Sequence, residues 1–129
     1  FCLHPHQDRF LAPATMCIPL PAGLPPARAV LGANMETALN ILWDARPLLG
    51  ERVLVVGGGV VGLLVARLLA RMPGTAVALH DTDARKQALA EAAGARFLAD
   101  AAAIPADHEL VIHASGHPDG LVTALSACE

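Results

Sequence analysis

The chain has 129 residues, of which 54% are hydrophobic and 16% charged, and its formal net charge is −3. A chain of this length and apolar content suits a single domain with a buried core, and it excludes intrinsic disorder. Lysine and arginine are not clustered and aromatic residues are scarce, which argues against a nucleic-acid partner. The apolar stretch 53–70 contains three consecutive glycines and Arg67, so we do not expect it to cross a membrane.

The three cysteines are Cys2, Cys17 and Cys128. They are too few and too far apart along the chain for a disulfide framework, and no pair has the spacing of a zinc knuckle. This cysteine usage predicts a reducing, cytoplasmic location, and no basic-then-apolar signal segment opens the chain. Because the chain begins with Phe1 and ends directly after an apparent helix, we expect it to be a piece of a longer protein.

The first 26 residues hold six of the ten prolines and show no helical period. This pattern predicts short extended segments at 10–12 and 17–21. From 27 to 45 the apolar residues follow one helical face, which predicts a helix that ends before Pro47.

A dinucleotide fingerprint follows this helix. The apolar strand 52–56 leads into a glycine turn at 57–62 and then into a helical stretch at 63–72. In such a motif Gly57 permits the tight turn, Gly59 lets the backbone approach a pyrophosphate, and Gly62 lets the helix pack closely on the sheet. With Gly58, Val60 and Val61 between them, these glycines form the predicted phosphate cradle at the helix start.

The second half of the fingerprint is a strand at 75–80 that ends in Asp81. An acid about 20 residues after the glycines accepts hydrogen bonds from the ribose hydroxyls, which favours NAD over NADP. Arg85 and Lys86 follow; their helical position is typical of surface charges, but both could also serve a 2′-phosphate. The alternative is a glycine-rich turn in an unrelated α/β unit with a solvated Asp81.

The rest of the chain continues the alternation. We expect a helix at 83–94, a strand at 96–98, a strand at 109–114 and a helix at 121–127. Strands that alternate with helices predict a doubly wound, Rossmann-type α/β fold with a parallel sheet and helices on both faces. The chain supplies about four strands, so this sheet is incomplete.

Several stretches together resemble the medium-chain dehydrogenase/reductase family, the zinc-type alcohol, sorbitol and threonine dehydrogenases. The resemblance rests on residues 11–14, 18–24, 37–39, 47–57 and 111–116. It implies that residues 1–26 are the tail of a GroES-like catalytic domain with its linker. Residues 27–129 would then be part of the NAD-binding Rossmann domain.

The resemblance also implies a function. A parent protein of this family would transfer hydride between an alcohol or ketone substrate and NAD, and a homo-oligomer is compatible with it. Thr37 would lie against the nicotinamide, unless its hydroxyl bonds back to its own helix, and Ser115 and Gly116 would lie beside the cofactor. The alternative function is a non-enzymatic NAD-sensing module.

Zinc in the parent stays an open question at this stage. Zinc-type members place a Cys or Glu ligand where this chain has Ala33, and their other ligands would lie upstream of Phe1. We therefore assign no metal ligand and no catalytic residue in this chain. His80 and His113, at strand ends, are predicted to border the cofactor cleft.

Overall fold

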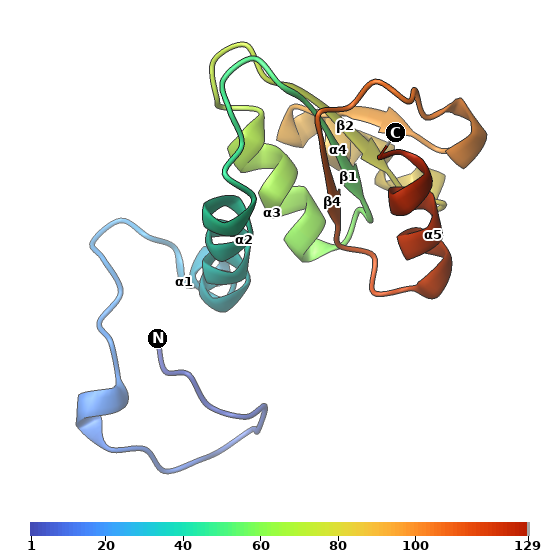
Figure 1. The fold of residues 1–129 in the computed structure, drawn as a ribbon. Coiled ribbons are helices and arrows are strands. Elements are labelled where there is room, and N and C mark those ends of the chain that lie inside the picture. The colour runs from blue at the N-terminus through green and yellow to red at the C-terminus, as the bar shows by residue number, and fades with distance from the viewer. Residues whose placement is uncertain (129) are drawn as a thin grey trace.

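Four parallel strands with helices on both sides make up the fold in Figure 1, a computed structural model that describes residues 1–128. The strands are β1 (Arg52–Val56), β2 (Ala76–His80), β3 (Arg96–Leu98) and β4 (Leu110–His113). Their order in the sheet is β3-β2-β1-β4, and every neighbouring pair is parallel. The predicted Rossmann-type α/β fold is confirmed: the chain builds outward from β1 to β3 and then crosses back to place β4 on the other side of β1.

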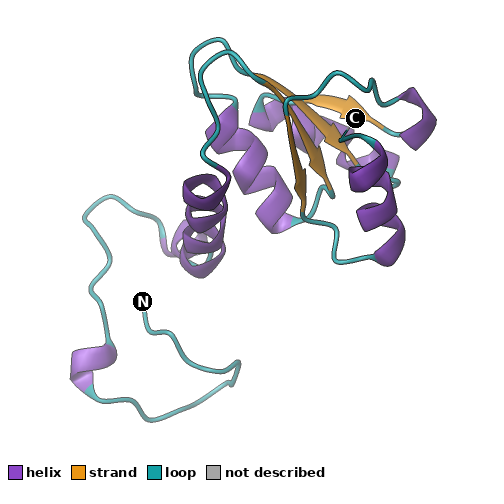
Figure 2. Ribbon diagram, in the orientation of Figure 1, coloured by secondary structure: helices purple, strands orange, loops and turns teal. Residues whose placement is uncertain are grey.

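Helices connect and cover these strands, as Figure 2 shows. They are α1 (Pro26–Ala29), α2 (Gly32–Ala45), α3 (Val60–Leu69), α4 (Gln87–Ala93) and α5 (Pro118–Ser126), with short 3-10 helices η1 (Ala14–Met16), η2 (Ala84–Lys86) and η3 (Ala101–Ala103). No helix among residues 1–128 has both the length and the apolar character needed to cross a bilayer.

The single helix expected at 27–45 is two helices, so that prediction was wrong in detail. The break falls at Val30 and Leu31, directly before Gly32. Glycine has a low helix propensity, and here the ring of Phe1 lies against it: a Cβ on Gly32 would be 3.2 Å from Phe1 Cε2.

The segment before α1 runs away from the sheet and back (Figure 1), and a domain boundary at 26/27 stays a prediction.

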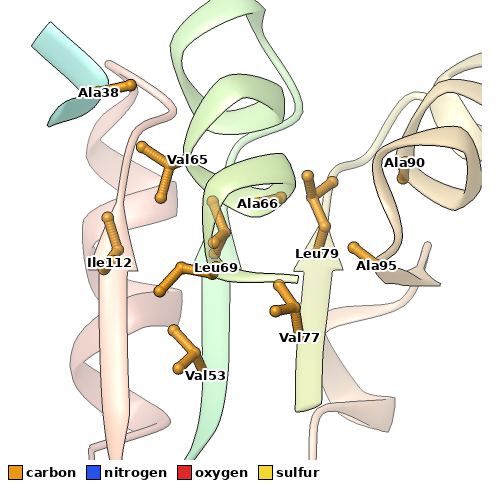
Figure 3. Close-up of a cluster of buried hydrophobic side chains, with 11 residues drawn as sticks. Ala38, Val53, Val65, Ala66, Leu69, Val77, Leu79, Ala90, Ala95 and Ile112 are labelled. Carbon is orange, nitrogen blue, oxygen red and sulfur yellow. The ribbon is translucent and has the colours of Figure 1, made fainter. Parts of the chain in front are cut away.

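Both faces of the sheet are buried, as a parallel sheet requires. Side chains of β1 alternate between two clusters: Val53 and Val55 point to one face, and Leu54 and Val56 to the other. On the first face they meet residues of α2, α3 and α4 (Figure 3), namely Ala38, Val65, Ala66, Leu69 and Ala90. On the second face they pack with Ala124 and Ala127 at the end of α5.

An ion cluster ties the starts of β1 and β4 together. The Arg52 guanidinium contacts Glu109 and lies 2.9 Å from Asp107 Oδ2, while the Arg52 amide donates to Glu109 Oε2 at 2.7 Å. Hydrogen bonds from the Arg52 side chain and amide lower the pKa of Glu109 from 4.5 to about 2. These groups are about half exposed, so we expect a modest contribution to stability.

This cluster generates a pH prediction. Because the folded pKa of Glu109 is depressed, its stabilisation is present above about pH 4.5 and is lost as the pH falls towards 2. In Glu109→Gln we expect a lower unfolding temperature at pH 6 and a shallower loss between pH 4.5 and 2. Thermal unfolding by circular dichroism across this range measures both, and Glu36→Gln, at an exposed position of α2, should behave as wild type. Equal acid dependence in Glu109→Gln and wild type would contradict the assignment.

Candidate functional site

The glycine turn after β1 is wedged between the ends of β2 and β4. Gly57 has a φ of +111°, which favours glycine, and its amide donates to His80 O at 2.8 Å. A Cβ on Gly57 would lie 2.5 Å from the backbone nitrogen of Ser115. The glycine turn therefore packs so closely against the segment after β4 that position 57 has no room for a side chain.

The other two glycines of the motif differ from each other. A Cβ on Gly62 would overlap the carbonyl oxygen of Gly57, so α3 begins directly on top of the turn. A Cβ on Gly59 would have no atom within 4 Å. Gly59 is also the N-cap of α3 and brings no side-chain acceptor, so the first N–H groups of the helix have no cap of that kind. Open space thus lies next to free backbone donors.

Asp81, directly after β2, is held by the glycine turn. Its Oδ2 accepts from the Gly58 amide at 2.7 Å and from Lys86 Nζ at 2.7 Å, and its Oδ1 accepts from the Asp83 amide at 2.8 Å. The side chain is 11% exposed. Burial acts to raise the pKa of Asp81, but the hydrogen bonds from Lys86 and the two amides outweigh it and lower the pKa below its ordinary value. Asp81 is therefore an ionised carboxylate at the edge of the glycine turn.

Lys86 is a site residue that the sequence analysis left among the surface charges. The Asp83 side chain accepts from the Arg85 amide at 3.0 Å and caps η2, and this turn brings the chain back toward Asp81. Lys86 then faces Asp81, whereas the Arg85 guanidinium pairs with Asp83 at 2.9 Å and its side chain is 90% exposed. The Arg85 hydrogen bonds lower the pKa of Asp83 to about 2. The spacing of five residues across a capped turn is the signal that points to Lys86.

The segment after β4 forms the facing wall. Ser115 Oγ lies 2.7 Å from His113 Nε2 and accepts from the His117 amide at 3.1 Å. A Cβ on Gly120, in the first turn of α5, would overlap the Ser115 hydroxyl. The hydroxyl is therefore held by two partners and enclosed by the helix start.

His80 is the one polar residue among the buried ones of the described chain, with 5% of its surface exposed. Its Nδ1 lies 2.9 Å from the carbonyl oxygen of Leu98, so Nδ1 must carry the hydrogen and donate it. In the neutral ring Nε2 is then an acceptor. The expectation that His80 borders the cleft agrees with its position in the wall of the cavity described next.

The glycine turn, the segment after β2 and the segment after β4 border a cavity of about 600 Å³. It lies at the carboxyl ends of β1, β2 and β4, where the strand order reverses, which is the position at which open α/β sheets bind ligands. The lining residues are Val56, Gly57, Gly59, His80, Asp81, Thr82, Lys86, Ala101, Ala114, Ser115, His117, Asp119, Gly120 and Thr123.

The cavity brings together four of the residues predicted for a cofactor site: Gly57, Gly59, Asp81 and Ser115. The other predicted residues within the described chain do not line it: Thr37, Gly58, Val60, Val61, Gly62, Arg85 and Gly116. Gly58 acts through Asp81, and Gly62 acts through its contact with Gly57.

Thr37 lies in α2, and its hydroxyl donates to the carbonyl oxygen of Ala33 at 3.1 Å. The Thr37 hydroxyl therefore bonds back to its own helix, which was the alternative to a position against the nicotinamide. Within residues 1–128 no group of three or more His, Cys, Asp or Glu residues could hold a metal ion.

No protein-family model matches this sequence, and no curated protein matches it. Solved structures do. An alcohol dehydrogenase from Thermus sp. ATN1 is 24% identical, with a TM-score of 0.73 over 84% of this chain and 35% of its own. A protein described as a zinc-binding dehydrogenase, from Sinorhizobium meliloti 1021 and bound to NADP, is 25% identical, with a TM-score of 0.73 over 84% of this chain and 36% of its own.

A protein described as a short chain alcohol dehydrogenase, from Escherichia coli CFT073 and complexed with NADH, is 22% identical, with a TM-score of 0.58 over 92% of this chain and 32% of its own. The chain thus spans about a third of the length of these structures. The resemblance read from the sequence is confirmed at the level of fold: these three solved structures are described as alcohol or zinc-binding dehydrogenases, and the chain has the fold of about a third of each.

Proposed function

We propose that this chain is the dinucleotide-binding part of an oxidoreductase that transfers hydride between an alcohol or ketone and NAD. One observation carries the proposal. The open space at Gly59 and the partly buried carboxylate of Asp81 border the same cavity, and the Gly58 amide links them by a 2.7 Å hydrogen bond. A diphosphate needs the first feature and an adjoining ribose needs the second.

Different residues of the site would bind different parts of this ligand. The free N–H groups at the start of α3 would bind the diphosphate, because a Cβ-free Gly59 leaves room for it. Asp81 and Lys86 would bind the adenine ribose: one acceptor site on Asp81 Oδ1 and two donors on Lys86 are still unused. The hydride chemistry belongs to the cofactor, and this chain contributes position and electrostatics.

Charge favours NAD over NADP. A 2′-phosphate carries between one and two negative charges near neutral pH, and Lys86 offers a single positive charge that already pairs with Asp81. A 2′-phosphate would therefore leave uncompensated negative charge beside a carboxylate that is 11% exposed. The ribose hydroxyls of NAD bring no charge.

The competing function is an NAD-sensing module without catalysis. The likeness of residues 11–14 and 18–24 to the end of a catalytic domain favours the enzyme. Zinc belongs to this proposal only through residues outside this chain, and catalytic residues would likewise lie in the rest of the parent.

Gly59 gives the first test. In Gly59→Val we expect NAD affinity to fall at least about tenfold, or 1.4 kcal/mol, because the side chain would fill the space of the diphosphate. The fold should survive, since nothing lies within 4 Å of that Cβ and the residue is in an extended conformation that valine adopts. Titration calorimetry with NAD measures the affinity and thermal unfolding the stability.

Gly62→Ala is the matched control, at the interior glycine of the same turn. Its Cβ would overlap Gly57, so it should lower the unfolding temperature clearly. Unchanged NAD binding in a folded Gly59→Val protein would remove the phosphate cradle from the proposal.

Cofactor preference gives the second test. Asp81→Asn keeps an acceptor for Gly58 but removes the charge, so it should weaken NAD at least about tenfold, since a hydrogen bond to a charged group contributes roughly 1.5–3 kcal/mol. It should also strengthen NADP, because Lys86 becomes free to pair with the 2′-phosphate. Adding Lys86→Met should cancel the gain for NADP. The ratio of the two dissociation constants is the measurement, and Arg85→Met, at a 90% exposed side chain, should leave it unchanged.

The enzyme itself gives the third test. The 129-residue chain alone should bind NAD weakly and show no alcohol-dependent reduction of NAD, because its sheet has four strands where a full dinucleotide-binding domain has six. A longer parent chain with the catalytic domain should reduce NAD with simple secondary alcohols. Turnover by the short chain would contradict the proposal, and NAD binding without turnover by the parent would favour the sensing module.

A further inference from the structure

Two cysteines that are far apart in the sequence face each other in the N-terminal segment. The terminal ammonium of Phe1 donates to Ile18 O at 2.6 Å, and the Ile18 amide donates to Phe1 O at 2.7 Å. This exchange is the hydrogen-bonded pair of an antiparallel ladder. The next pair in that register is Cys2 opposite Cys17, and Cys17 has the extended backbone that the ladder requires, with φ −94° and ψ 108°.

This register would place the two cysteines at a distance that a disulfide can span. The pair that follows a hydrogen-bonded pair has Cα atoms about 4.5 Å apart, and disulfides span Cα distances of about 4.4–6.8 Å. Both thiols are free, with Cys2 half-buried and Cys17 exposed. Burial raises the pKa of the Cys2 thiol, and the neighbouring Cys17 thiol raises it further.

A metal does not suit the pair. A structural zinc site needs four ligands, and no group of three or more ligating residues is present within 1–128. The nearby His4 stacks on Phe10, with ring centroids 4.0 Å apart, and its Nδ1 lies 3.1 Å from the Pro5 carbonyl oxygen. Two opposed thiols without further ligands are suited to oxidation.

We propose that Cys2 and Cys17 form a reversible disulfide by exchange with a small-molecule disulfide such as oxidised glutathione. One cysteine thiolate attacks the small disulfide and releases one small thiolate, which leaves a mixed disulfide. The second cysteine thiolate attacks that bond and releases the other small thiolate. The two cysteines lose two electrons and two protons, and the small disulfide gains both to become two thiols. The distance between the cysteines along the chain argued against a disulfide. The pairing of the folded backbone nevertheless places Cys2 opposite Cys17.

The link would fix a defined part of the surface. It closes the loop 2–17 and holds Phe1 beside Ile18, where the Phe1 ring rests against Gly32 at the start of α2. Phe1 and Ile18 also line an apolar groove of about 650 Å³, together with Met35 and Leu64 among others. Oxidation would therefore make the groove rigid without touching the nucleotide cavity.

Peptide mapping tests the link. The 129-residue chain is incubated with oxidised glutathione, free thiols are blocked with an alkylating reagent, and the chain is digested with trypsin. Cleavage after Arg9 separates the two cysteines, so the link joins peptide 1–9 to peptide 10–28. We expect this linked pair in wild type, with a loss of two hydrogen atoms from the intact mass and full reversal by dithiothreitol.

Serine variants supply the controls. Cys2→Ser and Cys17→Ser should abolish the linked peptides, whereas Cys128→Ser, in the segment after α5, should yield them as wild type does. Circular dichroism checks that each variant keeps its fold. Stable glutathione adducts on both cysteines without a link, or a link through Cys128, would overturn the proposal.

Discussion

The hydrogen bond from the Gly58 amide to Asp81 Oδ2, at 2.7 Å, is the contact on which the site depends. It joins the turn after β1 to the residue after β2, so the carboxyl ends of these two parallel strands are linked. Because the acceptor is ionised and largely buried, this bond is of the stronger kind. It orients the carboxylate and the start of α3 toward one cavity, and the second half of the nucleotide motif is thereby held in place by the first.

Packing around the glycine turn determines where a side chain is excluded and where space is left open. Side chains are excluded at Gly57, Gly62 and Gly120, where a Cβ would meet backbone or the Ser115 hydroxyl. At Gly59 the same atom would meet nothing. Gly59 is exposed and borders the cavity, so in the proposed function its open side is the place where a diphosphate would lie.

The N-terminal segment is governed by different physics. Its large apolar residues remain exposed, including Leu3, Leu11 and Ile18 at 68%, 99% and 63%. Apolar surface of this extent is typical of an interface with another domain or partner. Without a core of its own the segment depends on local contacts: the pairing of Phe1 with Ile18 and the packing of Phe1 on Gly32.

The sequence by itself determined the strands, the glycine turn and the placing of Asp81 after β2, since these follow from local periodicity and from residues that suit particular backbone angles. Tertiary structure decided what local patterns do not encode. The ring of Phe1 packs on Gly32 beside the break between α1 and α2, and Lys86 rather than Arg85 reaches Asp81 because a capped turn reverses the chain. Cys2 and Cys17 meet through a backbone pairing across 17 residues. Direction and proximity are set by the folded backbone, and a linear sequence records neither.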